Sequence, residues 1–84
     1  MEYSTANLQT MAYLIAIGRK PDRHAITREP GKPANVFYFW HDPDGSVRRD
    51  ADAYHAGALV VGKDFVRILR QTRRDLEHIM AGGR

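Results

Sequence analysis

Basic residues near the C-terminus are the side chains whose spacing most clearly suggests chemistry. Four of them are separated by four, three and four residues: Lys63, Arg67, Arg70 and Arg74. On a helix this spacing places them within about 60° of one another, and Arg73 lies beside them. Such a stripe can bind phosphates, which attract cations whatever the base sequence. One alternative is a plain solvated helix face, on which Asp75 and Glu77 pair with some of the arginines, and another is a surface for a protein partner.

Aromatic residues form a second candidate group, in the run from Val36 to Trp40. Successive side chains of a strand point to opposite faces, so Phe37 and Phe39 share one face while Tyr38 and Trp40 share the other. We expect the phenylalanines to face the core because they carry no polar group that needs a partner. We expect Tyr38 and Trp40 to face outward, because each has a hydrogen-bonding tip.

An outward aromatic face would suit a protein partner. Aromatic and arginine side chains dominate binding energy at interfaces, so the predicted anchors are Tyr38, Trp40, Arg23 and Arg28. The F-x-F spacing is also similar to that of RNA-recognition sheets, which stack bases on aromatic rings. The Lys/Arg-Gly context and the four-stranded order of those sheets are absent here, which makes base stacking the weaker interpretation.

Metal binding and catalysis have little support. No two of the four histidines (His24, His41, His55 and His78) are three or four residues apart, and the chain has no cysteine. The two serines, Ser4 and Ser46, are explained as helix caps. We therefore expect no metal, no cofactor and no enzymatic activity. A small hydrolase would require His41, His55 and Asp52 to converge on one pocket.

The elements that position these groups begin with a helix that ends at Gly18, with Ser4 or Thr5 as its N-cap. Its residues 11–17 are apolar all round, so it must be covered on more than one side. Two antiparallel strands are expected next, at 23–29 and 36–41, with the first as a polar edge strand.

A short helix over 46–57 follows, capped by Ser46, with Val47, Ala51 and Tyr54 on one face. Residues 58–61 are expected to form a brief strand or loop, 64–80 a long amphipathic helix, and 80–84 a frayed tail. The predicted fold class is therefore α+β, a two- or three-stranded sheet covered by helices, with the first and last helices on one face of the hairpin.

Length and composition set the wider limits. A chain of 84 residues with formal net charge +3 is expected to be a single domain, residues 1–84, and its mild basicity permits an acidic partner. The apolar run of residues 11–18 is too short to cross a bilayer, which takes about 20 residues. With no secretory signal evident, we expect a cytoplasmic protein that does not engage membranes.

Several fragments resemble a family of small domains of unknown function from phages and bacteria. With the F-x-F strand, they are YST at Tyr3–Thr5, AYLIAIG at Ala12–Gly18, AYHAGALV at Ala53–Val60 and DFVRILR at Asp64–Arg70. The resemblance covers most of the chain. It implies a small unit encoded in phage or prophage regions, with no assigned activity and no catalytic residues to carry over.

The leading functional hypothesis is a non-catalytic binding module, a phage or mobile-element accessory protein that contacts another protein, for example to inhibit a host or defence protein. A two-fold homodimer would be another way to cover the aromatic face. The alternative is a small basic protein that binds nucleic acid through Lys63, Arg67, Arg70, Arg73 and Arg74 of the last helix.

Overall fold

The structure is a computed structural model, and it describes residues 1–57 and 62–82. Its elements in chain order are β1 (Glu2–Thr5), α1 (Leu8–Ala16), β2 (Arg23–Thr27), β3 (Asn35–His41), α2 (Ser46–His55) and α3 (Gly62–Gly82). The predicted α+β class is confirmed, with three helices and a three-stranded antiparallel sheet. No helix in the described ranges is long and apolar enough to cross a membrane.

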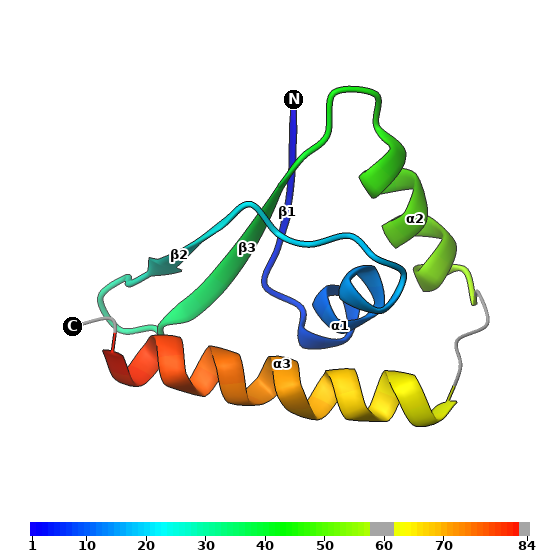
Figure 1. The fold of residues 1–84 in the computed structure, drawn as a ribbon. Coiled ribbons are helices and arrows are strands. Elements are labelled where there is room, and N and C mark those ends of the chain that lie inside the picture. The colour runs from blue at the N-terminus through cyan, green and yellow to red at the C-terminus, as the bar shows by residue number, and fades with distance from the viewer. Residues whose placement is uncertain (58–61, 83–84) are drawn as a thin grey trace.

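β3 is the central strand, because the order in the sheet is β1-β3-β2. It pairs antiparallel with β1 through Tyr3↔Trp40 and with β2 through Ala25↔Phe37. β2 is therefore an edge strand, as its polar sequence predicted. β1 and β2 run parallel to each other on either side of β3, and α1 connects them across one face of the sheet (Figure 1).

The N-terminal strand corrects one expectation. Ser4 and Thr5 do not cap a helix; they belong to β1, and the N-cap of α1 is Asn7, whose Oδ1 accepts from the N–H of Thr10 at 2.9 Å. Thr5 Oγ1 instead accepts from the N–H of Asn7 at 3.1 Å, in the turn between strand and helix. β1 extends the predicted hairpin to three strands.

α1 is covered on several sides over residues 11–14, as its apolar sequence predicted, whereas Ala16 and Ile17 at its C-terminal end are exposed. Met11, Ala12 and Leu14 are fully buried, because α1 lies between the sheet, α2 and α3 (Figure 1). Gly18, at φ +92°, ends the helix in the left-handed region. The N–H of Gly18 donates to Ile15 O at 3.0 Å and that of Arg19 to Leu14 O at 2.8 Å, the hydrogen-bond pattern of a Schellman cap.

The orientation predicted for β3 is wrong. Val36, Tyr38 and Trp40 face the helices and are 7%, 6% and 2% exposed, whereas Phe37 and Phe39 are half-buried on the other face. All three helices cover the same face of the sheet, and the face with the phenylalanines is open (Figure 1).

The two later helices match the sequence pattern closely. Val47 and Ala51 of α2 are buried and Tyr54 is half-buried, as predicted. Ser46 is not the cap, because Asp44 Oδ1 accepts the N–H of Ser46 at 3.0 Å and Asp42 Oδ1 accepts that of Val47 at 2.9 Å.

α3 extends further than predicted at its C-terminal end. Residues 80–82 are helical and not a frayed tail, and Met80 packs against the core. The brief strand expected over residues 58–61 lies outside the described residues, as do residues 83 and 84 of the expected tail.

Candidate nucleic-acid interface

The four basic residues predicted to share a face do so on the outer side of α3. Thr72, 2% exposed, marks the side of the helix that faces the core. At about 100° per residue the four cations lie on the side opposite Thr72, and all four are exposed. We name this line the basic ridge: Lys63, Arg67, Arg70 and Arg74.

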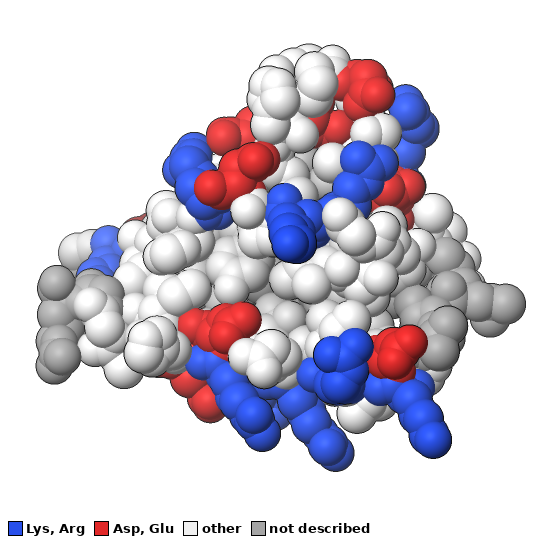
Figure 2. Space-filling view, in the orientation of Figure 1, with Lys and Arg blue, Asp and Glu red and all other residues white. Residues whose placement is uncertain are grey.

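The basic ridge lies along the edge of the molecule that is formed by α3. Figure 2 shows basic side chains projecting along that edge, away from the rest of the fold. At a rise of about 1.5 Å per residue, the ridge from Lys63 to Arg74 is roughly 16 Å long. It therefore presents its positive charge as one continuous line that a large partner can reach.

Packing of the opposite side holds the ridge in place. Phe65, Leu76, Ile79 and Met80 of α3 pack against the core cluster, and the Phe65 ring centroid is 6.0 Å from that of Tyr54 in α2. α1 packs along α3 as well. These contacts fix the rotation of α3 about its own axis, and that rotation points the ridge outward.

The cations of α3 differ in their surroundings from three cations elsewhere that form ion pairs, although the side chains of Lys20, Arg48 and Arg49 also have no carboxylate partner in the described structure. In the first half of the chain, Arg19 pairs with Asp50 at 2.9 Å, Arg23 with Glu2 at 3.3 Å and Lys32 with Glu29 at 3.3 Å. Within the described residues, no carboxylate lies within ion-pair distance of any ridge residue or of Arg73. Asp75, expected to pair with an arginine, accepts instead from Gln71 Nε2 at 3.0 Å.

Two residues that the sequence reasoning overlooked flank the ridge cations. Val66 is 45% exposed, one of the few large apolar side chains so placed in the described structure, and Gln71 is exposed on the other flank. Together with the four ridge residues and Gly62 they line an open hollow of about 610 Å³. The signal was present in the helical spacing, since Val66 and Gln71 lie three and eight residues after Lys63.

Glu77 marks the C-terminal limit of the ridge. It lies three residues after Arg74, on the same side of the helix, and is exposed. A carboxylate in this position repels an anionic ligand, so the attractive surface ends at Arg74.

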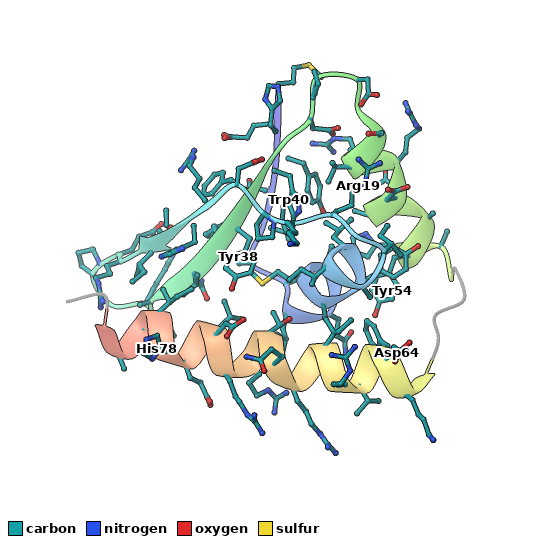
Figure 3. The ribbon with its side chains drawn as sticks, viewed as in Figure 1. Arg19, Tyr38, Trp40, Tyr54, Asp64 and His78 are labelled. Carbon is teal, nitrogen blue, oxygen red and sulfur yellow. The ribbon has the colours of Figure 1, made fainter. Side chains whose placement is uncertain are left out.

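The predicted protein-binding anchors Tyr38 and Trp40 are not at the surface. Figure 3 shows both side chains pointing from β3 toward the helices. Trp40 donates its Nε1–H to the carbonyl of Arg19 at 3.1 Å, so its polar tip finds a partner inside the fold. Burial raises the pKa of Tyr38, and the carboxylate of Asp75 raises it further. These two side chains cannot be anchors for a partner while the protein is folded.

The other two predicted anchors lie near the open face of the sheet. The guanidinium of Arg23 lies 3.8 Å from the Phe39 ring centroid, in a cation–π contact, and it also pairs with Glu2. Arg28 is exposed beyond the end of β2. Arg23 thus covers the ring of Phe39, which leaves less aromatic surface for stacked bases than the F-x-F spacing suggested.

One hydroxyl–imidazole contact was not foreseen. Thr10 Oγ1 lies 2.8 Å from His55 Nε2 and 3.2 Å from Asn7 Oδ1. Thr10 is fully buried, so a substrate cannot reach its hydroxyl, and the contact joins the start of α1 to the end of α2. Within residues 1–57 and 62–82, no three His, Cys, Asp or Glu side chains gather closely enough to hold a metal ion.

Comparison with known proteins adds no family assignment. No family model, curated protein or solved structure matches the chain. The resemblance to small phage and bacterial domains therefore stays a prediction.

Proposed function

We propose that the protein is a non-catalytic nucleic-acid-binding protein that neutralises phosphate charge with the basic ridge of α3. The observation that carries the proposal is the alignment of four exposed cations on one side of α3, none with a carboxylate partner among the described residues. Cations without internal partners remain available to an external anion. Nucleic acid is the densest linear array of such anions, with one charge per about 1.7 Å of duplex axis.

The arrangement of the positive charge is better suited to binding a polyanion than to binding a small ligand. The ridge is an open line about 16 Å long and encloses no deep cavity, so many weak contacts in a row suit it better than one buried group. The earlier preference for a protein partner rested on Tyr38 and Trp40, which are buried. With those anchors removed, the ridge is the surface with the clearest chemistry.

The test is the salt dependence of binding, measured by fluorescence anisotropy with a labelled DNA duplex. Four cations that each neutralise one phosphate charge give a log–log slope of affinity against salt of roughly −3.6. Replacing Arg70 by Ala should weaken binding and reduce the slope by about 0.9, with unchanged circular dichroism because the side chain is exposed. Lys20→Ala removes one exposed positive charge away from α3 and is the matched control.

A gain-of-binding variant makes the test sharper. Glu77→Gln removes the carboxylate at the end of the ridge, so it should tighten DNA binding at low salt and leave the fold unchanged. No binding at 50 mM salt, or equal losses for Arg70→Ala and Lys20→Ala, would contradict the proposal. Polyglutamate that competes as well as DNA at equal charge would point to an acidic protein as the partner.

A further inference from the structure

The centre of the basic ridge consists of arginines, and the outer two are separated by about the length of three base-pair steps of DNA. Arg67, Arg70 and Arg74 lie within about 60° of one another on the side opposite Thr72. Arg67 and Arg74 are seven residues apart, or about 10.5 Å along the axis of α3. Three base-pair steps of a duplex cover about 10.2 Å.

The flanks of the ridge carry side chains that a binder of phosphates alone does not need. Val66, on one side, leaves 45% of its surface exposed, and Gln71, on the other side, is an exposed amide whose Nε2 donates one hydrogen bond to Asp75 Oδ1. A thymine methyl group attracts apolar side chains, and an amide can pair with an adenine edge. These groups suit the floor of a groove, where base edges lie, better than they suit a row of phosphates.

Resting on the proposed function, we infer that α3 enters the major groove of B-form DNA, where the ridge cations neutralise phosphate charge and the guanidinium groups of Arg67, Arg70 and Arg74 reach guanine N7 and O6. A helix with its side chains is about 10–12 Å across and the major groove is about 12 Å wide, so the two fit. Arginine is the side chain that most often recognises guanine there, because its fork matches the N7 and O6 acceptors.

Duplex RNA and single strands fit the same surface poorly. The major groove of A-form RNA is deep and too narrow for side chains to read. Single-stranded binding depends on aromatic rings that stack with bases. The one phenylalanine of α3, Phe65, packs against the core on the other side of the helix.

The test uses the full chain with duplexes whose guanines are methylated at N7 by dimethyl sulfate. We expect methylation to weaken binding at least fivefold at guanines about three base pairs apart, because it blocks an acceptor in the major groove. A duplex RNA of the same sequence should bind at least tenfold more weakly than the DNA. Binding that is indifferent to N7 methylation, or equal for DNA and RNA, would overturn the groove inference while the proposed function stands.

A conservative substitution assigns the contact to a residue. Arg70→Lys keeps the positive charge and therefore the salt slope. It loses the planar guanidinium fork, so the sensitivity of binding to methylation at one guanine should fall. Arg49→Lys, on α2, makes the same chemical change away from the ridge and should leave the methylation pattern intact. An Arg70→Lys pattern identical to wild type would exclude Arg70 as a guanine contact. No binding to any duplex would reject the proposed function together with this inference.

Discussion

Trp40 is the largest buried side chain, with 2% of its surface exposed. It marks which face of β3 is the inner one. Replacing it by Ala should lower the free energy of unfolding by about 3–5 kcal/mol, because the change leaves a large cavity and an unpaired Arg19 carbonyl. Chemical denaturation measures the difference. The fluorescence of this single tryptophan should be blue-shifted in the native protein and shift to the red on unfolding.

Phe37→Ala is the matched control, because Phe37 is on the same strand but on the open face. It should lower the free energy of unfolding by only about 1 kcal/mol. Equal losses in the two variants, or a native emission like that of free tryptophan, would contradict the orientation of β3.

The reversal of β3 shows where residue-level prediction reaches its limit. All five residues from Val36 to Trp40 are apolar or aromatic, so no alternation marks the inner face. Polarity favoured Phe inside and Trp outside, but that rule assumes that the indole N–H lacks a partner in the core. Here the carbonyl of Arg19, just after the left-handed turn at Gly18, supplies that partner. A contact between residues 21 positions apart is not visible in a local pattern.

At the scale of elements, the start of α2 depends on two aspartates of the preceding turn. The Asp42 carboxylate accepts from the N–H groups of Val47 at 2.9 Å and Arg48 at 3.1 Å. Its desolvation raises the pKa, but these two donors outweigh that effect, and the pKa lies below its ordinary value of 3.8. The pKa of Asp44 is also lowered, chiefly by the N–H of Ser46.

This arrangement predicts a loss of stability in acid. A carboxylate whose pKa is lower in the folded state stabilises the fold above its unfolded pKa, and this contribution disappears as pH falls through the folded pKa. The melting temperature should therefore fall below about pH 4, and Asp42→Ala should flatten this dependence while lowering the melting temperature at pH 7 by roughly 5 °C. Thermal unfolding followed by circular dichroism measures both effects.

Glu77→Gln serves as the control, because it removes an exposed carboxylate that accepts no hydrogen bond in the described structure. It should leave the acid profile close to that of wild type. If Asp42→Ala retained the full acid dependence, the aspartate cap would not be its source.

Elements with strong internal periodicity were predicted well, and elements defined by distant pairing were not. Phe65, Ile68, Thr72, Leu76 and Ile79 repeat at helical spacing, which sufficed to place α3 and its basic ridge. β1 has only four residues, and its Ser-Thr pair is equally typical of a helix cap. Its strand conformation comes from pairing with β3, far along the chain.

At the scale of the whole molecule, one buried face carries two tyrosines that resist ionisation. Burial raises the pKa of both Tyr3 and Tyr38 above 10.0. A group whose pKa is higher in the folded state contributes stability below its unfolded pKa, and this contribution is lost as pH rises through the folded value. We therefore expect the protein to unfold above about pH 10, with part of the tyrosinate absorbance appearing only in that transition.

Tyr38→Phe isolates the effect of one hydroxyl. The variant keeps the ring in the core and removes the ionisable group. The stability difference between variant and wild type should therefore be more favourable to the variant at about pH 11 than at pH 7. The midpoints of chemical denaturation of both proteins, measured at pH 7 and at about pH 11, give this comparison. A difference between variant and wild type that did not change with pH would show that Tyr38 does not limit alkaline stability.

The place of β1 beside β3 also sets an order for folding. β2 and β3 are neighbours in the chain, so a short loop lets Thr27 find Asn35 early. Tyr3 must wait for Trp40, because β3 is the one strand that pairs with β1 in the described part of the chain. Closing so long a loop is entropically costly and depends on contacts already made by the hairpin. During synthesis on the ribosome, β1 is therefore made before β3 but pairs only after it, and Tyr3 stays in water until β3 has been made.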